Sequence, residues 1–83
     1  MRFFTYIVYS RTLDGYYVGH CQDLDKRLRR HNSGNGATYT KRAKDWVLKW
    51  SKPHSSRAEA SKDERAIKRK KSRKYIEFLI SGG

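Results

Sequence analysis

Two runs of aromatic and β-branched residues near the N-terminus, separated by a turn signal, limit the folds open to this chain. Residues 3–10 read Phe-Phe-Thr-Tyr-Ile-Val-Tyr-Ser, a composition typical of a β-strand. Asp14-Gly15 favours a turn, and the residues that follow it have the composition of a second strand. The sequence therefore predicts an antiparallel hairpin with strands at about residues 4–10 and 15–20.

A third strand is predicted in the second half of the chain, at about residues 46–51. Trp46, Leu48 and Trp50 alternate with other residues there, so we expect these three side chains on one face. Pro53 is expected to end the strand because proline cannot donate a hydrogen bond to a sheet.

Three helices complete the predicted fold. Each follows an Asp or Ser that can cap it, and they cover about residues 23–33, 57–71 and 73–80. The order β-β-α-β-α-α predicts an α+β fold, in which a small three-stranded antiparallel sheet is flanked by helices. Residues 1–83 are expected to form a single domain, because the sequence contains no internal repeat and no low-complexity linker.

The charge of the chain indicates the class of partner. Twenty Lys and Arg side chains against eight Asp and Glu give a net charge of +12. A chain this basic favours polyanions, with nucleic acid as the first candidate and an anionic membrane surface as the second. The most basic predicted helix offers mainly Ala and one Ile opposite its charges, so membrane binding is not expected.

Cysteine usage and hydropathy indicate the compartment. Cys21 is the only cysteine, which excludes an internal disulfide and fits a reducing environment. The apolar N-terminal run is too short for a membrane span and lacks the pattern of a secretory signal. We therefore expect a cytoplasmic protein that is a monomer or a weak dimer.

Polar residues on the first two predicted helices are candidates for chemistry. Glu64 lies between Ala60 and Ile67 on the apolar stripe of the second helix, where a carboxylate needs an ion-pair partner or a metal ion. Periodicity alone favours the ion pair. Arg27 and His31 share one face of the first helix, an arrangement that suits a phosphate group but also an ordinary solvated surface.

Taken together, these residues resemble the GIY-YIG nuclease family. The resemblance is to its small stand-alone bacterial members, of the UPF0213 type or similar to the N-terminal nuclease domain of the bacterial excinuclease. The two half-motifs of the family correspond to Phe4-Thr5-Tyr6, where Phe and Thr replace Gly and Ile, and to Tyr17-Val18-Gly19. Arg27 corresponds to the helix arginine, His31 to the histidine at the end of that helix, and Glu64 to the metal-binding glutamate.

The resemblance implies a divalent-metal-dependent endonuclease that cleaves phosphodiester bonds in nucleic acid, with DNA favoured over RNA, in DNA repair or processing. It implies Mg²⁺ or Mn²⁺ as the cofactor, bound by Glu64. The implied catalytic residues are Tyr6, Tyr17, Arg27, His31 and Glu64. The general base is one of Tyr6, Tyr17 and His31, and for the two tyrosines simple core packing is the alternative. Gly19 is expected to meet a backbone requirement at the end of its strand.

Clusters of basic residues predict where nucleic acid binds. The predicted contacts, in the loop before the third strand and at the end of the second helix, are Lys41, Arg42, Lys68, Arg69, Lys70 and Lys71. A solvated helix surface would have the same composition. The alternative function is a non-catalytic nucleic-acid-binding module that retains the nuclease fold. In either case a partner protein could select the target, since the sequence shows no separate targeting domain.

Overall fold

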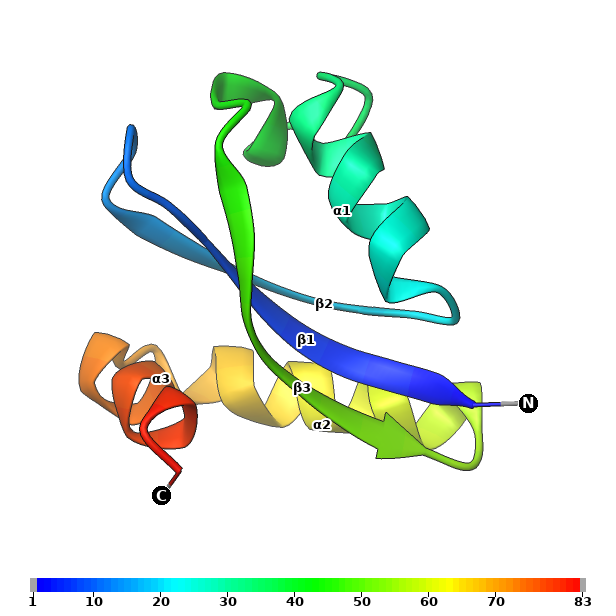
Figure 1. The fold of residues 1–83 in the computed structure, drawn as a ribbon. Helices are drawn as coiled ribbons and strands as arrows, with labels where there is room; N and C mark the ends of the chain where they lie inside the picture. The colour runs from blue at the N-terminus through cyan, green and yellow to red at the C-terminus, as the bar shows by residue number, and fades with distance from the viewer. Residues whose placement is uncertain (1, 83) are drawn as a thin grey trace.

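An antiparallel sheet forms the centre of the molecule, with helices on both of its faces (Figure 1). The computed structural model describes residues 2–82. The strands, in the spatial order β2-β1-β3, are β1 (Phe3–Ser10), β2 (Gly15–Cys21) and β3 (Trp46–His54). The helices are α1 (Leu24–Asn32), α2 (Arg57–Lys70) and α3 (Arg73–Ile80), with a 3-10 helix η1 (Thr40–Arg42) before β3. The predicted α+β fold and element order are confirmed, and η1 is an additional element.

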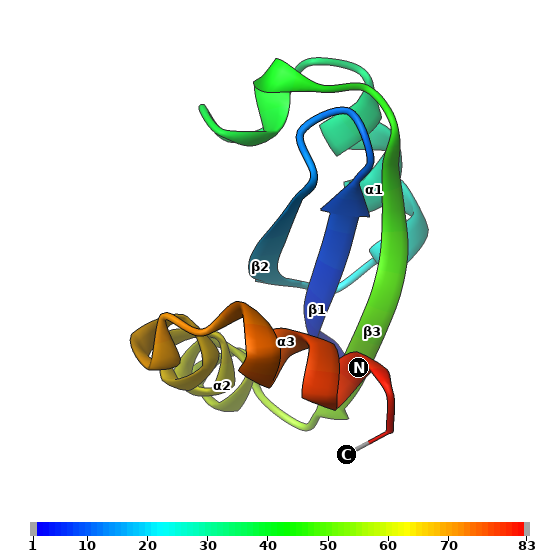
Figure 2. The same cartoon turned by 90° about the vertical axis from the view of Figure 1, so that its left-hand side faces the viewer.

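The core is divided by the sheet into two clusters, because the central strand β1 buries side chains on both faces. Figure 2 shows α1 on one side of the sheet and α2 with α3 on the other. The cluster under α1 contains Tyr6, Val8, Cys21, Ala43 and Trp46. The cluster under α2 and α3 contains Ile7, Val18 and Ile67. Successive residues of β1 thus contribute to opposite layers, as strand geometry requires.

A break in the register of β3 corrects one prediction. Leu48 lies opposite Val8 and Trp50 lies opposite Ile7, so Lys49 is an extra residue without a partner in β1. Such a bulge reverses the alternation of side chains between the two faces. Trp46 is therefore buried in the α1 cluster, whereas Trp50 packs against the α2 cluster. The prediction that both tryptophans share a face is wrong.

The end of β3 also differs from the prediction. The strand continues to His54, and Pro53 lies opposite Phe4 within it. Because β3 is at the edge of the sheet, a residue without a backbone N–H is tolerated there. His54 then contacts Asp63 of α2 through its Nε2, at 3.1 Å, so the extra length of strand helps to hold this helix.

Side-chain hydrogen bonds fix the helices on the sheet. The Asn32 amide at the end of α1 accepts from the Trp46 backbone N–H at 2.6 Å and donates to its carbonyl at 3.0 Å. On the other face, the buried hydroxyl of Thr5 donates to the carbonyl of Ala60 at 2.8 Å. These contacts set the positions of α1 and α2 relative to the strands between them.

Among residues 2–82, no helix has the length and apolar composition that crossing a membrane would require.

Candidate active site

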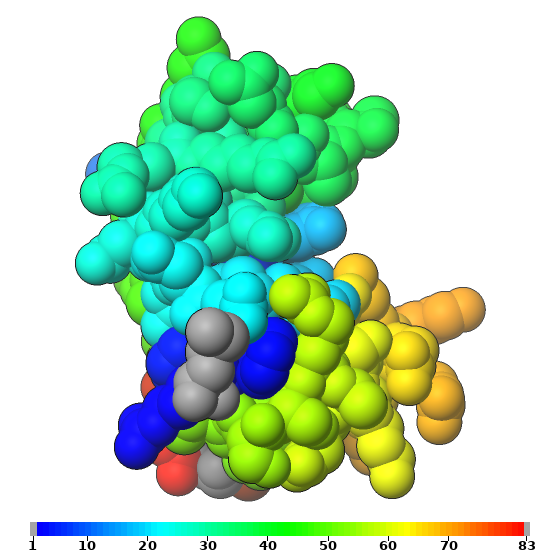
Figure 3. Space-filling view, turned by 90° about the vertical axis from the view of Figure 1, so that its right-hand side faces the viewer, coloured from blue at the N-terminus to red at the C-terminus, as the bar shows by residue number. Residues whose placement is uncertain are grey.

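The candidate site lies where the edge strand β2 passes between α1 and α2. Figure 3 shows residues of α1 and of α2 on either side of this strand. The half-buried ring of Tyr17 lies in this region, with its centroid 5.4 Å from that of His31 on α1. The Nζ atom of Lys68, from α2, lies 5.3 Å from the same ring centroid. Tyr17 is therefore in contact with side chains from both helical layers.

On the α1 side, a hollow of about 260 Å³ opens beside Tyr17. Arg27 and His31 line it together, as their spacing on the helix predicts, and Arg30 and Gly36 also contribute. Gly36 is required by close packing, because a Cβ at this position would lie 2.9 Å from His31 Nδ1. The hollow thus combines two guanidinium groups with an imidazole.

Tyr6 supports this site from inside the core. Its side chain is 1% exposed, and its hydroxyl lies 2.8 Å from His31 Nε2, close enough to share a hydrogen bond. Burial raises the pKa of the Tyr6 hydroxyl well above its ordinary value, although the nearby Arg27 opposes the shift. Tyr6 therefore stays protonated and positions His31.

Gly19 leaves the space that the Tyr6 ring occupies. The two residues lie opposite each other in the β1–β2 pairing, and a Cβ on Gly19 would lie 2.5 Å from the Tyr6 hydroxyl oxygen. The glycine is inside β2 and has no positive φ. The expected backbone requirement at a strand end is therefore corrected: Gly19 lies inside β2 and makes room for the Tyr6 ring of β1.

His31 is held neutral, and one of its ring nitrogens lacks a hydrogen-bond partner in the described part of the chain. It is 2% exposed, and burial, followed by the charges of Arg27 and Arg30, lowers its pKa to about 4. Its Nδ1 is buried and has no hydrogen-bond partner among the residues that the structure describes. Buried polar atoms are usually satisfied, so this nitrogen is available for a hydrogen bond to a water molecule or a ligand.

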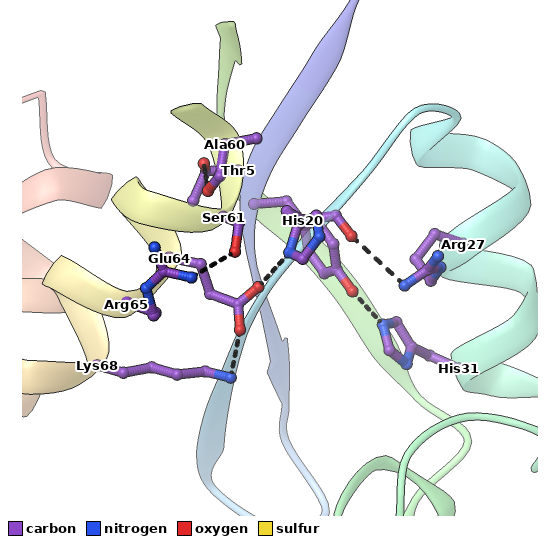
Figure 4. A network of polar contacts seen from close by, with 10 residues as sticks. Thr5, His20, Arg27, His31, Ala60, Ser61, Glu64, Arg65 and Lys68 are labelled. Atoms are coloured by element: carbon purple, nitrogen blue, oxygen red, sulfur yellow. Dashed lines mark hydrogen bonds and ion pairs between the residues drawn. The ribbon is translucent and has the colours of Figure 1, made fainter. Parts of the chain in front are cut away.

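Glu64 reaches β2 from the opposite face of the sheet (Figure 4). One carboxylate oxygen lies 2.6 Å from His20 Nδ1, and the other accepts a hydrogen bond from Lys68 Nζ at 2.6 Å. Burial alone would raise the pKa of this carboxyl, but the hydrogen bonds from Lys68 and His20 outweigh it and lower the pKa. The ion pair that periodicity favours for Glu64 is therefore present, and His20 is a second partner of the carboxylate.

The five predicted catalytic residues thus lie on two sides of one strand. Tyr6, Tyr17, Arg27 and His31 belong to the α1 side, and Glu64 belongs to the α2 side. His20 connects the two sides, because its ring contacts Glu64 while its carbonyl oxygen lies 3.5 Å from Arg27 Nη1.

Sequence reasoning missed His20 and Arg30. Alternation along β2 could have placed His20 on the same face as Val18, but not which helix covers that face. Arg30 has no comparable signal, because it is one of several arginines along α1 and only the fold brings it to the hollow.

The predicted nucleic-acid contacts lie in two separate exposed places. Lys41 and Arg42 lie in η1, where the Arg42 guanidinium is 5.7 Å from the ring centroid of Tyr39. The other four predicted residues form the end of α2 and its cap: Lys68, Arg69, Lys70 and Lys71. Lys68 is engaged with Glu64, and Lys70 lies over the Tyr75 ring.

Comparison with known proteins identifies the family. The sequence model described as the GIY-YIG catalytic domain matches residues 2–76. The chain belongs to the GIY-YIG family. This family is an endonuclease superfamily.

Bacterial UPF0213 proteins are similar to this GIY-YIG domain. A Streptococcus pneumoniae UPF0213 protein is 41% identical over 64 residues, which cover 77% of this chain and 65% of that protein. A UPF0213 protein from Staphylococcus saprophyticus is 33% identical over 78 residues, covering 93% and 95% of the two chains. The solution NMR structure of a Bacillus halodurans UPF0213 protein matches with a TM-score of 0.59 and 32% identity, covering 98% of this chain and 84% of the other.

Proposed function

We propose that this GIY-YIG domain is a divalent-metal-dependent endonuclease that hydrolyses phosphodiester bonds, with DNA as its substrate. One observation carries the proposal: Arg27 and His31 on α1, and Glu64 on α2, reach the same stretch of the edge strand β2. A fold that needed only to bind a polyanion would have no use for a carboxylate at that place, because it repels phosphate.

The hollow beside Tyr17 suits the scissile phosphate. Arg27 and Arg30 supply the planar, permanently charged donors that match phosphate oxygens. His31 Nδ1 is the buried polar atom without a partner in the described chain. During hydrolysis negative charge grows on the phosphate oxygens, and Arg27 would stabilise that charge in the transition state.

Among the three candidates for the general base, His31 is favoured over Tyr6. Tyr6 is buried and its pKa is raised, so it is a poor acceptor of a proton from water. His31 is neutral near pH 7, but its pKa of about 4 makes it a weak base before a phosphate binds. A phosphate bound to Arg27 and Arg30 would offset the charges that lower the pKa of His31, and would make its imidazole more basic. Tyr17, at the edge of the hollow, would orient the attacking water.

Glu64 fits a role as the protein ligand of Mg²⁺ or Mn²⁺. Within residues 2–82, no three His, Cys, Asp or Glu side chains are grouped so that they could hold an ion by themselves. Mg²⁺ commonly uses one or two carboxylates and takes its remaining ligands from water and substrate phosphate. The Lys68 side chain is 46% exposed, so it can leave the Glu64 oxygen that it now contacts. Bound there, the ion would supply Lewis-acid stabilisation of the scissile phosphate and the leaving oxygen.

The ion pair between Glu64 and Lys68 favours one alternative, a nucleic-acid-binding module without turnover. The deciding experiment incubates the purified protein with branched, nicked, single-stranded and duplex DNA, and with matched RNA. Each incubation contains Mg²⁺, Mn²⁺ or EDTA. The proposal predicts cleavage with a metal ion and none with EDTA. Binding to these substrates without cleavage under any metal condition would establish the binding module instead.

A further inference from the structure

A second hollow lies next to the candidate site, between α1 and the start of α2. It has a volume of about 310 Å³, and its lining includes Lys26, Arg27 and Arg30 of α1 and Arg57 of α2. In Figure 3, residues from the start of α2 meet those around the start of α1 on this side of the molecule. The hollow is therefore built from two helices that lie on opposite faces of the sheet.

Four cationic side chains line this second hollow against a single carboxylate. Asp23 also lines it, but this carboxylate accepts a hydrogen bond from the backbone N–H of Lys26 and caps α1. No ion pair in the described part of the chain involves any of the four cationic side chains. Bringing like charges together costs free energy unless an anion lies among them.

Arg57 is the cation of this hollow whose position on its helix is least favourable. It is the first residue of α2, directly after the cap Ser56, where the helix dipole disfavours a positive charge. Its guanidinium lies 5.2 Å from the ring centroid of Phe3, a contact that directs the side chain along the surface. A cation held at an unfavourable helix end, beside three others, fits the binding of phosphate oxygens.

We infer that the second hollow binds another phosphate group of the nucleic-acid strand, next to the phosphate held beside His31. Arg27 and Arg30 line both hollows, so the two sites are adjacent. The statement that the neighbouring phosphate is the scissile one rests on the proposed function. The second phosphate site is independent of the proposed function. The strand then crosses α1 toward Arg57.

The test compares two variants that remove the same charge from the same helix. Arg57→Gln alters the second hollow, and Lys62→Gln alters an exposed side chain outside it. Binding of a fluorescent single-stranded oligonucleotide and of its duplex is measured in EDTA at several salt concentrations. Loss of one phosphate contact should make the log–log salt slope shallower by about 0.7 for the single strand and about 0.9 for the duplex. We expect this change in Arg57→Gln and not in Lys62→Gln.

A second arm distinguishes strand phosphate from free phosphate. Inorganic phosphate is added to the wild type and to Arg57→Gln, against chloride at equal ionic strength. If phosphate displaces the oligonucleotide more than chloride does, and only in the wild type, the hollow also accepts the free anion. The absence of this displacement, together with the slope change, would assign the hollow to the strand. A salt slope in Arg57→Gln equal to that in Lys62→Gln would overturn the inference, whatever the phosphate arm shows. Because cleavage is not measured, a failure of the proposed nuclease activity would leave this result intact.

Discussion

His31 combines burial, a neighbouring tyrosine hydroxyl and two nearby guanidinium groups. Burial and the charges of Arg27 and Arg30 disfavour the imidazolium. Because its pKa lies at about 4 in the folded chain and about 6.5 in the unfolded chain, the unfolded state takes up a proton first as the pH falls. The contribution of His31 to stability is therefore complete above pH 6.5 and is lost as the pH falls from 6.5 to about 4.

This difference in pKa gives a measurable prediction. NMR titration of the His31 ring should give a pKa near 4, and the free energy of unfolding should fall by up to about 3 kcal/mol between pH 6.5 and 4. In His31→Gln, the free energy of unfolding should change little in the upper part of this pH range, because the carboxyl groups with lowered pKa values titrate at lower pH. A His31 pKa near 6.5 in the folded protein would contradict the assigned environment.

Adding a nucleic-acid oligonucleotide without metal should raise the His31 pKa, if phosphate binds to Arg27 and Arg30 as proposed. The same titration measures this shift.

Glu64 shows how far sequence reasoning reaches at the residue scale. Periodicity placed it between Ala60 and Ile67, and both of those residues are buried as predicted. The partner Lys68 lies four residues further on, within the spacing at which helical side chains meet. His20 could not be assigned in the same way, because its contact with Glu64 depends on how α2 packs across β2.

At the scale of elements, the site depends on how α1 is held against the sheet. Asn32 makes both of its hydrogen bonds to the backbone of Trp46, at the start of β3. Asn32→Ala removes both bonds and should cost about 2 kcal/mol. For a chain of this size that corresponds to a fall in Tm of roughly 8–16 °C. Asn35→Ala, in the exposed loop, is the control and should leave Tm nearly unchanged. Equal Tm values for the two variants would contradict the role of Asn32.

Local signals predicted the elements but not the details of their pairing. The hairpin follows from strand composition on both sides of Asp14-Gly15, and the three helices follow their capping residues Asp23, Ser56 and Ser72. The bulge at Lys49 has no such signal, because it is an irregularity in the pairing of β3 with β1. Its consequence is that Trp46 and Trp50 lie in different layers of the core.

At the scale of the whole molecule, the excess of positive charge dominates interactions with polyanions. The net charge is +12, and the basic residues extend over α1, η1 and α2. Affinity for DNA in EDTA should fall steeply with salt, with a log–log slope of roughly −3 to −6 because several phosphate contacts release counterions. Fluorescence anisotropy across a salt series measures this slope. A slope near zero would remove nucleic acid as the partner.

The central claim is that Glu64 serves metal-dependent cleavage and not only an ion pair with Lys68. Glu64→Gln keeps the size of the side chain but removes the charge that would hold the ion. Asp63→Asn is the matched control, since it removes a carboxylate one residue earlier, where Asp63 contacts His54.

The decisive measurement is the Mg²⁺-dependent cleavage rate of these two variants beside the wild type, on a substrate that the wild type cleaves. The account predicts a loss of at least about 100-fold in Glu64→Gln and a rate close to the wild type in Asp63→Asn. Thermal melting without metal checks that both variants are folded. Cleavage by folded Glu64→Gln at the wild-type rate would contradict the account.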